Sequence, residues 1–193
     1  MKTLKSIVSI FVAILFTSCA STYKVIEPNR TNFPPSSKEG KVSLAYRYDV
    51  LREAGNKKMG KSEIRNDVRV VAIKLTNLSD SIIDIKRDLT FYCGAYPVTL
   101  MTPFQLKTQV QQSWWAYSLF CIGCLTFAPL DVIVFGGIGV GNMMVASNAN
   151  NQFLNEAIKF DITNKQLKPG ETISGLIGFK TTHSDPITIK VKE

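Results

Sequence analysis

Histidine is nearly absent from this chain of 193 residues, because His183 is the only one. It stands in Thr181-Thr182-His183-Ser184-Asp185, which is typical of a turn and contains no further cluster of metal ligands. A zinc site needs several ligands, a hydrolase needs a nucleophile beside a base, and a phosphate loop needs glycines followed by Lys-Ser or Lys-Thr. None of these combinations occurs in the sequence. We therefore expect no enzyme, no metal site and no cofactor.

Clustered charge of one sign is also absent from the sequence pattern. The chain has 23 basic and 15 acidic residues, which gives a formal net charge of +8. The two signs are interspersed, and no predicted helix carries a basic stripe with interleaved aromatic residues. Nucleic-acid binding is therefore not expected. The charge excess favours a mixed, solvated surface, and attraction to anionic lipid headgroups is the alternative.

The N-terminus has the anatomy of an export signal. Lys2 and Lys5 precede an apolar run over residues 7–16, and small residues lead up to Cys19. The run of about ten residues is too short to cross a bilayer as a helix. We therefore predict residues 1–18 as a signal peptide. Both lysines leave with it, so that the mature chain has a net charge of +6.

The segment Phe16-Thr17-Ser18-Cys19 resembles the lipobox of bacterial lipoproteins, with Phe16 where that family usually has leucine. The resemblance implies that Cys19 is lipidated and becomes the new N-terminus. Ala20 follows the cysteine, where an aspartate would imply retention in the inner membrane. The resemblance thus implies an outer-membrane lipoprotein held by its N-terminal lipid, on either face of that membrane. An ordinary cleaved signal with an incidental cysteine is the alternative.

Patterning divides the mature chain into a linker and a strand-rich domain. Residues 19–40 are rich in turn-forming residues, which predicts a lipid anchor and linker. From residue 41 apolar and polar residues alternate, which indicates strands with one buried face. The predicted strands are 42–50, 68–75, 82–85, 89–92, 96–101, 172–178 and 187–191. Residues 53–62 predict a solvated loop.

Two turn motifs flank these strands. Thr76-Asn77-Leu78-Ser79-Asp80 precedes an isoleucine-rich strand, and Leu167-Lys168-Pro169-Gly170-Glu171 precedes a final hairpin. This order resembles immunoglobulin-like domains of exported bacterial proteins over residues 41–101 and 160–193. The resemblance implies a fold and no function. The predicted fold class is mainly β (α+β), an immunoglobulin-like β-sandwich over residues 41–193 with a helical apolar insert at about 103–158 and one amphipathic helix after it.

The apolar insert is the feature that an ordinary sandwich lacks. Residues 108–155 contain one formal charge, Asp131. On each side of Pro129 lie about 16 apolar or small residues, which as a helix would be about 24 Å long, short of the roughly 30 Å hydrocarbon core. The block is therefore either a helical hairpin that enters one leaflet or meets a membrane partner, or two buried core elements. Residues 142–160 predict the amphipathic helix.

Glycines in the insert allow two interpretations. Gly137 and Gly141 have the small-xxx-small spacing that permits close helix approach. Because Gly136 and Gly139 lie between and beside them, the segment could equally be a flexible turn between strands.

Three cysteines remain besides Cys19. Cys121 and Cys124 form a CxxC pair, which in an exported protein can be a redox dithiol. They lie in an apolar run without a nearby basic residue, and this favours a structural role. Cys93 could form a disulfide with either of them, and the sequence does not fix the pairing.

The sequence as a whole predicts a non-enzymatic, lipid-anchored module of the cell envelope. Its expected partners are the membrane and an envelope protein or a second copy of the chain. A thiol-redox protein that uses the CxxC pair is the alternative. The residues expected to contact the membrane or partner are Trp114, Trp115, Phe120, Phe135, Gly137 and Gly141.

Overall fold

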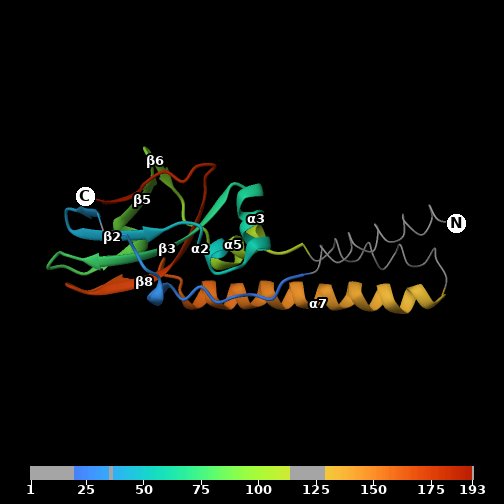
Figure 1. Ribbon diagram of the computed structural model, residues 1–193. Helices are drawn as coiled ribbons and strands as arrows, with labels where there is room; N and C mark the ends of the chain where they lie inside the picture. The colour runs from blue at the N-terminus through green and yellow to red at the C-terminus, as the bar shows by residue number, and fades with distance from the viewer. Residues whose placement is uncertain (1–19, 35–36, 114–128, 193) are drawn as a thin grey trace. The chain divides into compact units, whose positions relative to one another are not determined.

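The computed structural model describes residues 20–34, 37–113 and 129–192, and it divides the chain into two compact units. Unit 1 comprises residues 1–22 and 112–149, and unit 2 comprises residues 23–111 and 150–193. Figure 1 shows the elements along the chain. The backbone therefore passes between the two units at three places, after residues 22, 111 and 149.

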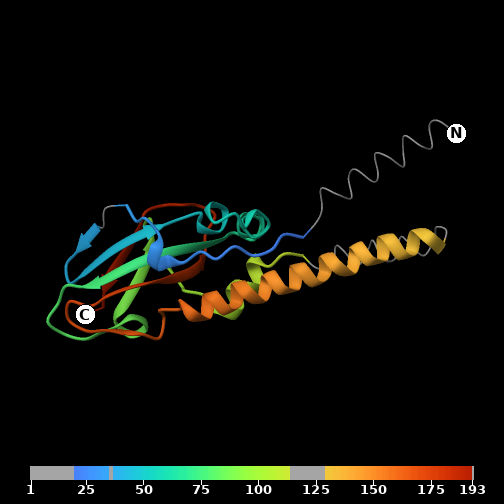
Figure 2. The ribbon, with the colours of Figure 1, turned by 60° about the horizontal axis from the view of Figure 1, so that its bottom comes forward.

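Unit 2 is built on a four-stranded antiparallel sheet in the order β1-β2-β3-β8 (Figure 2). Its strands are β1 (Ser37–Glu39), β2 (Val42–Arg47), β3 (Val68–Asn77) and β8 (Thr172–Lys180). Residues 70–73 of the central strand β3 are all buried, so both faces of this strand are covered. The register pairs Val68 with Lys180 at one end of β3 and Thr76 with Thr172 at the other.

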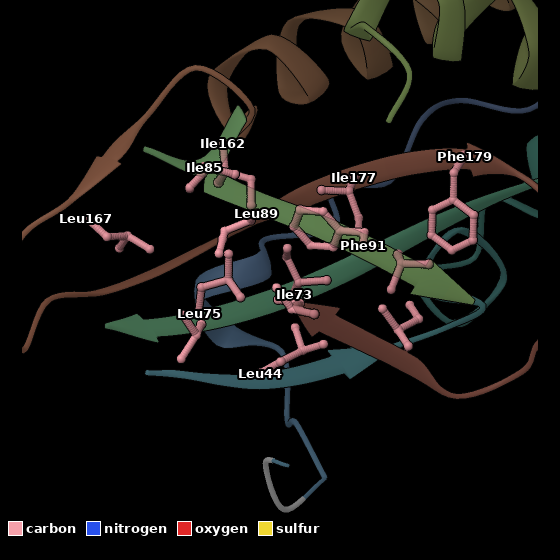
Figure 3. Close-up of a cluster of buried hydrophobic side chains, with 14 of the residues drawn as sticks. Leu44, Ile73, Leu75, Ile85, Leu89, Phe91, Ile162, Leu167, Ile177 and Phe179 are labelled. Carbon is pink, nitrogen blue, oxygen red and sulfur yellow. The ribbon is translucent and has the colours of Figure 1, made fainter. Parts of the chain in front are cut away.

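Two smaller antiparallel sheets complete the β structure of unit 2. One has the order β6-β5-β9 and the other is the pair β4-β7. Their strands are β4 (Ile83–Asp84), β5 (Leu89–Cys93), β6 (Tyr96–Val98), β7 (Gln166–Leu167) and β9 (Ile187–Val191). One hydrophobic core contains side chains from all three sheets, including Ile73, Phe91 and Leu167 (Figure 3). Among the residues that the structure describes, none in this core cluster lies in 108–155.

The helices follow from local signals and from packing. They are η1 (Pro28–Arg30), α2 (Val50–Glu53), α3 (Lys57–Arg65), α4 (Ile85–Asp88), α5 (Pro103–Val110) and α7 (Pro129–Lys159). α5 begins at a capping box in which Thr102 and Gln105 satisfy each other's backbone N–H groups. α7 begins at a proline, which suits the first turn because its missing N–H needs no partner there.

The two turn motifs singled out in the sequence meet at Asn77, which is fully buried. Its side-chain amide donates to the carbonyl oxygens of Ser81 and Leu167 at 2.7 and 3.0 Å. Its carbonyl oxygen accepts from the backbone N–H and the hydroxyl of Ser79. One side chain thus ties the end of β3 to the segment that precedes β8.

The expected strands are largely present, and the chain is a mixed α and β fold with open antiparallel sheets rather than mainly β. The solvated loop predicted over residues 53–62 is wrong, because α2 ends and α3 begins there. The interpretation of the glycine series as a turn is also wrong, since Gly136 to Gly141 continue the helix α7. The helix expected over 142–160 is present as the second half of α7.

Candidate functional site

In unit 1 the residue after Cys19 lies at the base of the apolar insert. The backbone N–H of Ala20 donates to Oδ1 of Asn142 at 2.9 Å. Ser21 makes two hydrogen bonds with the side chain of Gln112, its N–H donating at 3.2 Å and its carbonyl accepting at 2.7 Å. We call these four residues the insert base. They join the chain at Cys19 to both ends of the stretch 113–141.

Beyond the insert base, α7 continues from Asn142 back to Pro129. These 13 residues are about 20 Å of helix. Between residues 113 and 149 the only formal charge is Asp131. Half of a hydrocarbon core is about 15 Å, so this part of α7 is long enough for one leaflet. Among the described residues, no helix has both the length and the hydropathy that crossing a bilayer requires.

In unit 2 a single carboxylate binds the segment that follows the insert base. Glu156 of α7 is buried, and its Oε1 accepts the backbone N–H groups of Ile26 and Glu27 at 2.9 and 3.0 Å. The hydroxyl of Tyr23 donates to Oε2. The Tyr23 ring packs edge-on against Phe153, with centroids 6.0 Å apart. Burial and the neighbouring carboxylate raise the pKa of Tyr23, so that it stays a protonated donor.

A second buried side chain binds the same segment. Asn56, directly before α3, accepts from the N–H of Lys24 at 2.8 Å and donates to its carbonyl at 2.6 Å. We call residues 23–30 the N-terminal segment. Because Asn56 and Glu156 hold it on unit 2, only residues 20–22 separate Cys19 from unit 2. Three extended residues span about 10 Å, so much of the predicted linker is bound rather than free.

Glu63 is the second buried carboxylate of unit 2, with 1% of its surface exposed. Its Oε1 accepts the N–H of Val70 at 2.7 Å, and its Oε2 has no hydrogen-bond partner among the described residues. Burial raises the pKa of this carboxyl to about 7, and the Val70 hydrogen bond opposes the rise. Near neutral pH both the neutral and the charged form of this carboxyl group are therefore populated.

Cys93 is a free thiol with 4% of its surface exposed. The hydroxyl of Tyr48 lies 3.6 Å from its sulfur and donates to the carbonyl of Asp185 at 2.7 Å. The pKa of Tyr48 is raised mainly by burial. In the described part of the chain, no basic side chain hydrogen-bonds the sulfur.

The remaining predicted site residues are placed as follows. Six lie outside the described residues: Cys19, Trp114, Trp115, Phe120, Cys121 and Cys124. Phe135 and Gly137 lie in α7, where the structure describes only the backbone at these two positions. Gly141 is exposed, and a Cβ built on it meets no atom within 4 Å. His183 is exposed, as expected for a turn residue.

The described residues contain no candidate metal site. No group of three or more His, Cys, Asp or Glu side chains there could hold a metal ion. A hollow of about 500 Å³ beside Tyr46 and Tyr48 contains one charged pair, Arg47 and Glu53, whose atoms approach to 2.6 Å. That pair satisfies its own charges. The described arrangement holds chain segments in place and presents surfaces.

Four residues of this site were not singled out from the sequence. They are Asn56, Gln112, Asn142 and Glu156, and each hydrogen-bonds the N-terminal part of the chain. The sequence pattern gives no signal for them. Asn56 lies in the predicted loop over residues 53–62, and Glu156 falls on the polar side of the helix predicted over 142–160. Comparisons with family models, curated proteins and solved structures find no match for this chain.

Proposed function

We propose that this chain is a lipid-anchored lipoprotein of the bacterial cell envelope, a non-enzymatic structural or interaction module whose apolar insert enters the leaflet that holds its lipid. One observation carries the proposal. Ala20, the residue after the proposed lipidation site, is hydrogen-bonded to Asn142 at the insert base. The acyl chains on Cys19 and the insert would therefore start from the same place.

Length and composition of the insert support the same conclusion. The part of α7 beyond Asn142 is about 20 Å long, which suits one leaflet and is too short for a full bilayer. None of the described residues in the core cluster that joins the three sheets of unit 2 lies in 108–155. An apolar block that a domain does not need for its core is typical of a membrane or protein contact. Contact with an envelope protein or a second copy is the alternative outcome.

For unit 2 we propose an immunoglobulin-like β-sandwich. Strands β2-β3-β8 and β6-β5-β9 match the orders A-B-E and C′-C-F of that fold. The chain passes from the first sheet to the second twice, between β3 and β5 and between β8 and β9. Both sheets contribute side chains to one core (Figure 3). Such a domain supplies a rigid body for presenting surfaces and needs no active site.

The thiol-redox alternative is not proposed, because no described feature favours it. Cys93 is buried in unit 2, and the CxxC pair lies outside the described residues. An outer-membrane location follows from Ala20 and is part of the proposal. Density-gradient fractionation tests it, and recovery entirely with the inner membrane would contradict it.

Two measurements on the purified protein test the proposal. Mass spectrometry of the mature N-terminus should show a lipid on Cys19, and Cys19→Ala should abolish it. Trp114 and Trp115 are the only tryptophans, so tryptophan fluorescence reports on the insert alone. In vesicles, lipids brominated along their acyl chains should quench this fluorescence, and aqueous acrylamide should quench it little. An N-terminus without lipid, or tryptophans open to acrylamide and insensitive to bromine, would refute the membrane function.

A further inference from the structure

The exposed face of α3 is basic along its whole length. Lys57, Lys61 and Arg65 are exposed and spaced four residues apart. Each residue of an α-helix is rotated by about 100° from the one before it, so the side chains of these three residues and of Ile64 leave the helix within an arc of about 100° around its axis. The opposite side of the helix buries Met59, Gly60, Ser62 and Glu63. The sequence spreads these charges among other residues, and the helix brings them onto one face.

Few opposite charges compensate this face. In the described part of the chain neither Lys57 nor Lys61 has an ion-pair partner, and Arg65 contacts only the hydroxyl of Ser62 at 3.4 Å. Glu63 is buried on the other side of the helix. Of the acids in the adjoining turns, Glu53 is paired with Arg47, and Asp67 is exposed just after the helix. Ile64 adds an exposed apolar side chain, 49% accessible, to the same face.

α3 also lies at the end of unit 2 from which the chain leaves for unit 1. Asn56, at its start, holds the backbone of Lys24, and Ser62 donates to the carbonyl of Gln111 at 3.2 Å. Asn66 donates to the carbonyl of Gln109, so α5 packs beside it. Lys107 of α5 in turn donates to Asn151 of α7. All three connections to unit 1 therefore adjoin α3 or its neighbour α5, which Figure 1 labels together at one end of β3.

We propose that the face of α3 formed by Lys57, Lys61, Ile64 and Arg65 binds anionic phospholipid headgroups of the membrane that holds the lipid anchor. The inference rests on the proposed function, because the anchor brings this end of unit 2 to a lipid surface. Charge complementarity selects the occupant: phosphate groups on a surface attract basic side chains. An exposed isoleucine among the cations is typical of helices that lie on a lipid interface.

The test compares vesicles of phosphatidylcholine with and without phosphatidylglycerol, using the full mature chain with Cys19→Ser. Without its lipid, the chain binds through the insert and through charge. The insert contributes to both kinds of vesicle, so the ratio of the two binding constants isolates the charge contribution. Each basic residue near an anionic surface contributes about fivefold, so Lys57→Gln, Lys61→Gln and Arg65→Gln together should lower the ratio about a hundredfold. High salt should lower the wild-type ratio in the same way.

A matched control removes the same charge from the other end of unit 2. The N–H of Leu78 donates to the carbonyl of Lys41, and that of Gly170, in the turn that contains Lys168, donates to Asn77. Both lysines thus lie at the Asn77 end of β3. At the rise per residue of a strand, this end is about 30 Å from Val68. The third lysine of the control is Lys86, which follows β4, the strand that pairs with β7 just before Lys168. Replacing these three lysines by Gln should leave the ratio nearly unchanged. An equal loss in both variants would overturn the assignment to α3.

Acetylation of lysines on the wild-type lipoprotein provides a second measurement that needs no mutation. In vesicles containing phosphatidylglycerol, Lys57 and Lys61 should be protected relative to Lys41 and Lys168. Equal labelling of all four in both kinds of vesicle would refute the proposal for α3. The lipid on Cys19 is established separately by mass spectrometry, so this failure is distinguishable from failure of the proposed function.

Discussion

Glu63→Gln should remove most of the pH dependence of the stability of unit 2 between about pH 5 and about pH 8. The carboxyl is buried, and its pKa is raised from 4.5 to about 7. In this window the folded protein therefore binds a proton that the unfolded chain has released. The free energy of unfolding is greatest at low pH and decreases as pH rises through the pKa of the folded state.

The magnitude follows from the shift in pKa. One unit corresponds to about 1.4 kcal/mol, so the wild type should lose about 2–3 kcal/mol of unfolding free energy between about pH 5 and about pH 8. Few other groups titrate there, because the chain has one histidine. The glutamine keeps the acceptor for the N–H of Val70 and cannot ionise. Its amide nitrogen takes the unpartnered place of Oε2, so the slope and not the absolute stability is the relevant quantity.

Denaturant titrations followed by circular dichroism at a series of pH values measure this slope. Glu53→Gln is the matched control, since Glu53 is exposed on α2 and should leave the slope nearly unchanged. Equal slopes for Glu63→Gln and the wild type would refute the reasoning. They would mean that water reaches Oε2 and that the carboxylate is ionised in the folded state.

Two further predictions concern the attachment of the N-terminal part of the chain. Glu156→Ala leaves the Tyr23 hydroxyl and two backbone N–H groups without their acceptor. The free energy of unfolding should therefore fall by about 3 kcal/mol, and proteolysis after Lys24 should accelerate. Asn155→Ala, on the exposed side of α7, is the control and should change neither quantity. Replacing residues 113–147 by a short Gly/Ser linker in the Cys19→Ser chain should raise solubility and keep the β-strand circular dichroism, because none of the described residues in the core cluster lies in that stretch. An unfolded deletion variant beside a soluble, monomeric parent would show that the stretch is core.

The strands could be predicted because their signal is local and long. In β3 and β8, apolar residues alternate with polar ones or follow one another over nine or ten positions. The strands that pair with them have the same pattern. α3 could not be predicted in this way. It has only two apolar residues, Met59 and Ile64, and a glycine at position 60. A Cβ at Gly60 would collide with the side chain of Arg52, so the glycine allows close packing rather than marking a loop.

The candidate site depends on pairings that are remote in sequence. Ala20 and Asn142 are 122 residues apart, and Tyr23 and Glu156 are 133 apart. No periodicity records such contacts, since each partner is a single polar residue on an otherwise ordinary helix or loop. The predicted lipidation site and the apolar insert, by contrast, are visible in the composition of the sequence. The sequence therefore predicts which segments meet the membrane, and the hydrogen bond between Ala20 and Asn142 is needed to find that the two predicted features start from one place.

In the proposed function the lipid would supply the affinity for the membrane, so the proposed additional contacts are explained better by orientation of the domain. A single anchored residue would leave a domain on 21 free linker residues able to rotate and to move tens of ångströms from the surface. Binding of the N-terminal segment by Asn56 and Glu156 reduces the free length to residues 20–22. If the insert and α3 also contact the bilayer, the chain is held by more than its lipid, and rotation of the domain is restricted. The Asn77 end of unit 2, about 30 Å along β3, would then face away from the membrane. That end carries the exposed apolar residues Leu78 and Ile82, so an oriented module would present them outward.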